Sequence, residues 1–312
     1  SNIVSDFKDT LIGGRIDKIY QTEKDEIILN VRSQGENYRV LLTAHSSYPR
    51  IHFTTQAKDN PQAPPMFCML LRKHISSGRI LDIIQPNFER IVEIHIESTS
   101  ELGDLITKRL IIEIMGRHSN IMLVNYDDKI LDSIKHITKM QSSIREVLPG
   151  RTYVLPPSHN KCNPLLRTYD QFTRSLEEDE KPVPIYKKLY SIYSGMSPLV
   201  AKEICYRGDI DPSTVTSLLD ATQIKTLYNE MNAIYTDVEN QNYTPALYTD
   251  GNKIVAFSSI PLLLYKDTEQ KEFEDASMLL ESFYFDQSES SRVNQKTADM
   301  RRILQTHKER AI

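Results

Sequence analysis

Residues 105–125 read LITKRLIIEIMGRHSNIMLVN, two strongly apolar runs separated by a short polar turn. The runs Leu105–Met115 and Asn120–Asn125 are rich in Ile, Leu and Val, which is typical of β-strands. The few residues between them suit an antiparallel connection. We therefore expect a stiff β scaffold that displays polar side chains at one edge.

Further strand signals lie on both sides of this pair of runs. They occupy Arg15–Tyr20, Glu26–Arg32, Tyr38–Thr43, Arg50–Phe53, Arg90–Glu97 and Lys129–Ile137. Two helices interrupt them, one over Asn2–Ile12 that ends at Gly13-Gly14, and one over Met66–Ser77 that begins after Pro64-Pro65. Several antiparallel hairpins with only two helices predict an α+β module rather than a doubly wound parallel sheet.

The pattern changes after a cluster of prolines within residues 148–164. From Thr168 to about Asn240 it is helical, with the turn Ser194-Gly195-Met196-Ser197-Pro198 between two helices. Strand signals return over Ala246–Tyr265, and an amphipathic helix around Leu279 follows. We predict a β-rich module at 1–160, a helical domain at 161–240 and a return segment packed on the first module at 241–288.

The last residues, 289–312, predict the start of a coiled coil that continues beyond Ile312. A weak heptad seam recurs there in alternating steps of four and three, at Val293, Thr297, Met300, Leu304, His307 and Ala311. The alternative is an ordinary amphipathic terminal helix. From Arg292 onward six basic residues face two acids, so this end is positive although the whole 312-residue chain carries a net charge of −4.

Composition excludes several classes of protein. The three cysteines, Cys68, Cys162 and Cys205, form no C-x-x-C pair, which argues against a disulfide scaffold and for a reducing, cytoplasmic compartment. No apolar run reaches the roughly 20 residues that span a bilayer, and none near the start resembles a secretory signal.

Signatures of catalysis are also missing from the sequence. It contains no P-loop, dinucleotide-binding, nucleophile-elbow or zinc-protease motif, and its eight histidines show no spacing typical of metal ligands. We expect a protein that is not an enzyme and holds no metal or cofactor.

Two polar clusters are candidates for binding. In the first, the turn that carries Arg117, His118, Ser119 and Asn120, arginine can grip a phosphate or stack on a base and asparagine can read a base edge. The alternative is a turn whose polar side chains satisfy backbone groups. Basic residues surround it in sequence, namely Lys108, Arg109, Lys129, Lys135, Lys139, Arg145 and Arg151.

The second cluster is Pro86-Asn87-Phe88-Glu89-Arg90, which precedes a predicted strand. An acid beside an arginine presents an acceptor next to a forked donor, which suits a nucleotide. The alternative is an exposed ion pair of little energetic value.

These clusters, together with the stretches GGRIDKIYQ (residues 13–21) and LPGRTY (residues 148–153), resemble the amino-terminal domain of the NFACT family over nearly the whole chain. The resemblance implies a first module similar to that of formamidopyrimidine-type DNA glycosylases and a helix-hairpin-helix-like domain around residues 193–201. Glycosylase chemistry needs an amino-terminal Pro-Glu and a four-cysteine zinc finger, and the sequence matches neither.

The resemblance also implies a function and a set of partners. The family includes a ribosome quality control factor that binds the obstructed large ribosomal subunit with peptidyl-tRNA and recruits alanyl-tRNA, so that the ribosome adds alanine tails. It implies tRNA-binding roles for Glu89, Arg90, Arg117, His118, Ser119 and Asn120, where Glu89 replaces the family's aspartate. Other members are called fibronectin- or fibrinogen-binding proteins, so the alternative is a surface adhesin.

Overall fold

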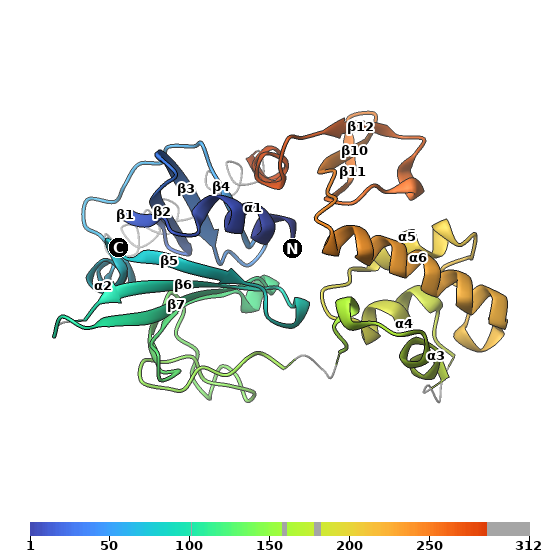
Figure 1. Cartoon of the computed structure of the whole chain (residues 1–312), viewed down its shortest axis with the longest axis horizontal. Helices are drawn as coiled ribbons and strands as arrows, with labels where there is room; N and C mark the ends of the chain where they lie inside the picture. The colour runs from blue at the N-terminus through green and yellow to red at the C-terminus, as the bar shows by residue number, and fades with distance from the viewer. Residues whose placement is uncertain (101, 158–160, 178–181, 286–312) are drawn as a thin grey trace, which may run out of the picture.

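The structure is a computed structural model that describes residues 1–100, 102–157, 161–177 and 182–285 (Figure 1). Within them the first part of the chain forms a nine-stranded antiparallel sheet of order β4-β3-β2-β1-β5-β6-β7-β8-β9. Its strands are β1 (Arg15–Glu23), β2 (Glu26–Ser33), β3 (Glu36–Thr43), β4 (Arg50–Phe53), β5 (Arg79–Ile84), β6 (Ile91–Thr99), β7 (Leu105–Glu113), β8 (Asn120–Val124) and β9 (Ile130–Ser133).

The sheet curls so that β1 to β4 and β5 to β7 form two layers (Figure 1). Inward side chains from both layers share one core, in which Leu29 and Ile94 are fully buried. The helices α1 (Asn2–Leu11) and α2 (Met66–Ile75) add Phe7 and Leu71 to this core. A second, smaller cluster on the outer face of β6 to β8 is covered by the segment that carries Val147 and Tyr153.

The helical part that follows agrees with the predicted change of pattern. It contains α3 (Tyr169–Glu177), α4 (Ile185–Ile192), α5 (Pro198–Arg207) and α6 (Ala221–Glu239). The predicted turn lies between α4 and α5, where the Ser197 side chain accepts a hydrogen bond from the Val200 amide and caps α5. At α6, Asp220 and Gln223 form a capping box.

The chain then returns to β structure and to the first module. A small sheet of order β11-β10-β12 contains β10 (Ala246–Asp250), β11 (Lys253–Ser258) and β12 (Glu269–Glu272), and its Tyr248 lies in the same core as α3 to α6. Residues 276–285 are helical and contact β4, where the Phe53 amide donates to the Ser277 hydroxyl at 2.9 Å. Five short 3-10 turns complete the described elements: η1 (Pro86–Phe88), η2 (Gly116–His118), η3 (Pro164–Leu166), η4 (Thr216–Leu218) and η5 (Leu263–Tyr265).

The α+β class is confirmed, whereas three finer predictions stay predictions: the glycosylase-like module, the helix-hairpin-helix-like domain and the domain limits. The coiled coil predicted for 289–312 lies outside the described residues. Across the residues that the structure describes, no helix has both the length and the apolar character needed to cross a bilayer.

Candidate nucleic-acid interface

The two polar clusters lie side by side at one end of the sheet. Ile91 at the start of β6 pairs with Glu113 at the end of β7. One residue further out, the Ile114 amide donates a 2.8 Å hydrogen bond to the Arg90 carbonyl. The loop of residues 86–90 and the turn of residues 114–120 are therefore joined through their backbones.

Arg90, Arg117 and His118 carry exposed side chains at this end. Arg117 and His118 lie in η2, where the Arg117 Nε donates to the His118 Nε2 at 3.0 Å. Gly116 has φ +56, a conformation that glycine adopts without the side-chain clash other residues meet. The tight turn thus directs two adjacent polar side chains away from the sheet, where they are free to meet an anionic partner.

Ser119 and Asn120 have a different role, because they are only 1% and 2% exposed. The Ser119 hydroxyl accepts a hydrogen bond from the Met115 amide at 2.8 Å. The Asn120 side chain donates to the Lys135 carbonyl at 2.8 Å and accepts from the amides of Ile121 and Lys135. These two side chains satisfy backbone groups and fix the turn that carries Arg117 and His118.

The loop of residues 86–90 is held by the helical part of the chain. Asn87 and Phe88 both have positive φ, at 49° and 58°, which is uncommon for residues with side chains. The Ser194 hydroxyl donates to the Asn87 carbonyl at 2.7 Å. Gly195, at φ +67, lies so close that a Cβ there would come within 2.4 Å of the Phe88 carbonyl oxygen.

The Phe88 ring completes this contact. It packs edge-on against Tyr235 of α6, with 5.8 Å between the ring centroids. Figure 1 shows the carboxyl end of β5, which leads into this loop, directed towards the helices. Glu89 and Arg90 therefore sit where the β module meets the helical part. The sequence does not predict this contact, because nothing in the turn of residues 194–198 indicates its distant partner.

A buried ion pair supports the turn from inside. Glu113 is fully buried and binds the Arg145 guanidinium with one oxygen, while the other accepts a hydrogen bond from the Tyr153 hydroxyl at 3.1 Å. Burial and the neighbouring Glu113 carboxylate raise the pKa of Tyr153 well above its usual value. Tyr153 is therefore a permanent hydrogen-bond donor at physiological pH.

Several of the surrounding basic residues are engaged within the protein. Arg109 pairs with Glu93 at 3.1 Å and also with Asp128, and Arg151 pairs with Glu146 at 3.1 Å. Burial acts to raise the pKa of Glu93, but the hydrogen bond with His95 and the Arg109 guanidinium outweigh it and hold that pKa below its usual value. The positive charges counted in the sequence thus overstate the charge presented to a partner.

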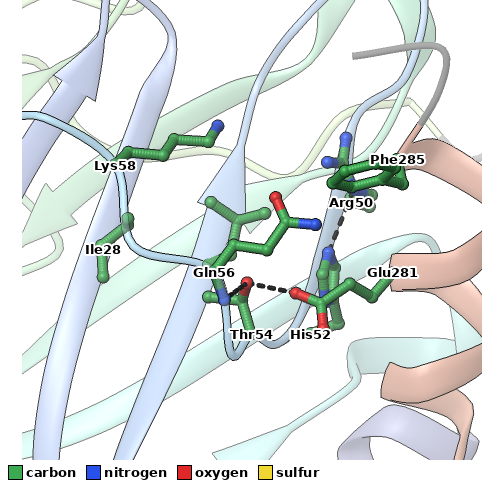
Figure 2. Close-up of a pocket in the computed structure, with 9 residues that line it drawn as sticks. Ile28, Arg50, His52, Thr54, Gln56, Lys58, Glu281 and Phe285 are labelled. Atoms are coloured by element: carbon green, nitrogen blue, oxygen red, sulfur yellow. Dashed lines mark hydrogen bonds between the residues drawn. The ribbon is translucent and has the colours of Figure 1, made fainter. Parts of the chain in front are cut away.

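A small cavity beside β4 is a weaker candidate site (Figure 2). Its volume is about 10 Å³, enough for one water molecule at most. Arg50 donates to the His52 Nε2 at 3.1 Å, and Glu281 accepts hydrogen bonds from Thr54 and Thr55. The Glu281 contacts attach the helix of residues 276–285 to the segment after β4, so the cavity is structural. Among the described residues, no group of three or more His, Cys, Asp or Glu side chains is placed to hold a metal ion.

Comparison with known proteins gives a family match over the whole chain and relatives that match most of it. The family described as "NFACT N-terminal and middle domains" matches residues 1–312. A Bacillus subtilis protein named Rqc2 homolog RqcH is 38% identical over 300 residues, which are 96% of this chain and 50% of that protein. The chain therefore spans about half the length of this curated relative.

Solved structures agree with the sequence matches. The amino-terminal part of a fibronectin/fibrinogen-binding protein from Streptococcus suis superposes with a TM-score of 0.76 at 32% identity, covering 91% of this chain and 97% of that one. A fibrinogen-binding protein from Staphylococcus aureus gives 0.76 at 30% identity, with 91% and 96% covered. On this evidence the chain belongs to the NFACT family and comprises its N-terminal and middle domains.

Proposed function

We propose that this chain is the RNA-binding amino-terminal part of a ribosome quality control factor. In this proposal the whole protein binds an obstructed large ribosomal subunit that carries peptidyl-tRNA and recruits alanyl-tRNA. The ribosome's own centre forms the peptide bonds of the alanine tail, so the protein acts in the cytoplasm without a catalytic site of its own. The relatives include proteins named as Rqc2 homologs and as subunits of the ribosome quality control complex, and this supports the proposal.

The observation that carries the tRNA-binding part is the pairing of two arginine loops at one end of the sheet. Arg90 and Arg117 are exposed, and the bond between Ile114 and Arg90 fixes the spacing of their loops. Arginine presents a planar fork of donors that matches phosphate oxygens and also stacks on bases. In the proposal both arginines contact tRNA, His118 adds a neighbouring contact and Glu89 orients Arg90.

Ser119 and Asn120 enter the proposal as positioning residues. Their side chains are buried and bonded to backbone, so they act on tRNA through the shape of the turn. A Glu89→Asp variant tests the second loop, since it shortens the carboxylate by one methylene and restores the aspartate of the family pattern.

The decisive experiment combines two measurements. Titration of tRNA with the 312-residue chain should show binding that weakens in Arg90→Ala and Arg117→Ala, each with a salt slope reduced by about one unit. Purification of the full-length protein from cells should recover the large subunit together with tRNA. Absence of both RNAs from that material would overturn the proposal.

A second candidate function is binding of fibronectin or fibrinogen. It rests on the names of the two structural neighbours above, which are called fibronectin/fibrinogen-binding and fibrinogen-binding proteins. Surface plasmon resonance with immobilised fibronectin and fibrinogen, together with fractionation of cells, tests it. Binding that is unaffected by tRNA, combined with protein at the cell surface, would favour this function over the first.

A further inference from the structure

Three arginines form a row across the middle of the nine-stranded sheet. Arg15 of β1 lies opposite Arg32 of β2 on one side and opposite Arg79 of β5 on the other. Residues directly opposite each other in a sheet point to the same face. All three side chains are exposed, while their neighbours Ile16, Val31 and Ile80 are buried in the core. The row therefore lies on the outer face.

The backbone holds Arg15 and Arg79 at close range. The Ile16 amide donates to the Gly78 carbonyl and the Ile80 amide donates to the Gly14 carbonyl. These flanking bonds make Arg15 and Arg79 a non-hydrogen-bonded pair, the kind whose Cα atoms approach to about 4.5 Å and whose side chains are closest. Like charges directly opposite each other in this way destabilise a sheet.

The fold offers little to neutralise this row. Among the described residues, no carboxylate oxygen lies within ion-pair distance of the Arg15, Arg32 or Arg79 guanidiniums, and Arg15 has one long contact, 3.4 Å, to the Ser77 carbonyl. The nearest acids by position are Asp17, which lines the adjoining groove, and Glu97, which is opposite Arg79 on β6. Glu97 shares the outer face with Arg79, but among the described residues it forms no ion pair with it, so the row keeps positive charge that an external anion would stabilise.

An open groove of about 620 Å³ adjoins the row. Arg15 and Arg32 line it together with two tight turns, at Gly13 and at Gln34-Gly35. A Cβ at Gly13 or Gly35 would meet no atom within 4 Å, so the backbone there is open to a ligand. Ile12, which also lines the groove, is 42% exposed and offers an apolar surface beside the charges.

We infer that Arg15, Arg32 and Arg79 bind consecutive phosphodiester groups of an RNA strand that crosses this groove. Neighbouring strands lie about 4.8 Å apart, so the three residues span roughly 10 Å, which suits a chain of anions better than one small ion. Guanidinium forks match phosphate oxygens, and Ile12 gives sugars and bases an apolar contact.

This site deepens the proposed RNA-binding function and rests on it, but it is separate from the loops of Arg90 and Arg117. Arg79 is opposite Glu97 near one end of β6, whereas Arg90 precedes its other end. At about 3.4 Å per residue, the seven residues from Arg90 to Glu97 place the two sites roughly 24 Å apart along the sheet. A bound RNA would thus meet the β module at two separate places, and the second contact gains from the first by effective concentration.

The test uses the 312-residue chain with Arg32→Gln and Arg79→Gln, and with Arg39→Gln as the matched control. Arg39 is an exposed arginine of β3 that lies outside the row and bonds to the Gln56 carbonyl. The probe is a fluorescent oligouridylate of about 20 nucleotides, followed by anisotropy over a range of salt. Each row variant should bind roughly tenfold more weakly, with a salt slope smaller by about 0.7, whereas Arg39→Gln should bind like the wild type.

Thermal unfolding gives a readout that a purely structural role would not reproduce. Removing one of the opposed charges should leave Tm unchanged or raise it, so that binding falls without loss of stability. Equal binding by all three variants, or loss of binding together with a lower Tm, would overturn the site. A polyglutamate probe that binds better than the RNA and depends on the same arginines would overturn it in favour of an acidic polypeptide.

The same measurements distinguish failure of the proposed function from failure of the arginine row. If Arg90→Ala and Arg117→Ala retain full tRNA affinity while the row variants lose oligouridylate, the two loops are not the tRNA contact and the row stands. If the two loop variants lose tRNA while the row variants keep oligouridylate, the row is wrong and the loops stand.

Discussion

The Ile114 amide donates a 2.8 Å hydrogen bond to the Arg90 carbonyl, one residue beyond the paired residues Ile91 and Glu113. This bond extends the β6–β7 ladder into the two polar loops. It means that the loops do not depend on side-chain contacts with each other to keep their spacing. Substitutions of the exposed arginines should therefore test binding without disturbing the scaffold.

The first prediction distinguishes a residue proposed to contact tRNA from a residue that holds the turn after β7 in shape. Arg117→Ala should weaken tRNA binding and leave the free energy of unfolding unchanged, because its side chain is exposed. Asn120→Ala should lower that free energy by about 2 kcal/mol, because buried backbone groups lose their partners. Urea unfolding beside tRNA titration checks both. Loss of stability in Arg117→Ala would contradict this division.

The second prediction concerns the contact between the loop of residues 86–90 and the helical part. Gly195→Ala should destabilise the protein by more than about 1–2 kcal/mol, because the new Cβ is strained at φ +67 and also clashes with the Phe88 carbonyl. Binding of tRNA should weaken as well, since this loop carries Arg90. Urea unfolding and tRNA titration are the measurements.

Gly251→Ala is the matched control for this variant. Gly251 also has positive φ, at +56, but a Cβ there would meet no atom within 4 Å. It should show the conformational cost alone and full tRNA affinity. Equal stability losses in the two variants would mean that the Phe88 contact contributes nothing.

The third prediction tests the buried support of the interface. Glu113→Gln should cost about 3 kcal/mol of stability, because it leaves the largely buried Arg145 guanidinium without its counter-charge. Tyr153→Phe removes one hydrogen bond to the same carboxylate and should cost about 1 kcal/mol. Chemical denaturation of both variants measures the difference. A cost for Tyr153→Phe as large as that for Glu113→Gln would show that the charge pair is not the dominant contact.

The fourth prediction is a pH dependence of stability caused by His52. Burial, and then the nearby Arg50 guanidinium, lower the pKa of His52 to about 4, against roughly 6.5 for an unfolded chain. Between these values the unfolded state binds a proton that the folded state does not. As far as His52 is concerned, the free energy of unfolding should therefore be greatest above about pH 6.5. It should fall by roughly 1 kcal/mol per pH unit as the pH drops towards 4.

The comparison that isolates this effect is the difference between the wild type and His52→Gln. Burial, followed by repulsion from Asp275, raises the pKa of Asp6 to about 6, which acts in the opposite direction within the same pH range. Asp6 is present in both proteins, so it cancels in the difference. Denaturation at a series of pH values between 4 and 8 gives the result, and a constant difference across the range would show that His52 does not titrate as described.

The sequence predicts the hairpins well, because their strands carry strong apolar patterns. It missed β5, and the reason is a bulge between Ile80 and Asp82 that breaks the alternation of residues 79–84. It also missed β12, whose four residues are all exposed and polar. A strand without a buried face leaves no periodic signal.

At the candidate site, the sequence indicated two polar loops but not which of their side chains are exposed and which are buried. Spacing alone does not distinguish Arg117, which is exposed, from Asn120, which is 2% exposed and begins β8, the strand next to the edge strand β9. The contact of Ser194 and Gly195 with residues 87 and 88 joins positions more than 100 residues apart. Such a contact depends on how the two parts of the chain pack, which no local pattern records.

The place where β1 meets β5 has a consequence for motion as well as for charge. Its register contains a single opposed pair, Arg15 and Arg79, so the layers on either side are joined along a very short seam. Separation of the layers would break the bonds donated by the Ile16 and Ile80 amides. Hydrogen exchange at those two amides therefore reports whether the halves of the sheet open as one unit, and an anion bound across the arginines should slow it.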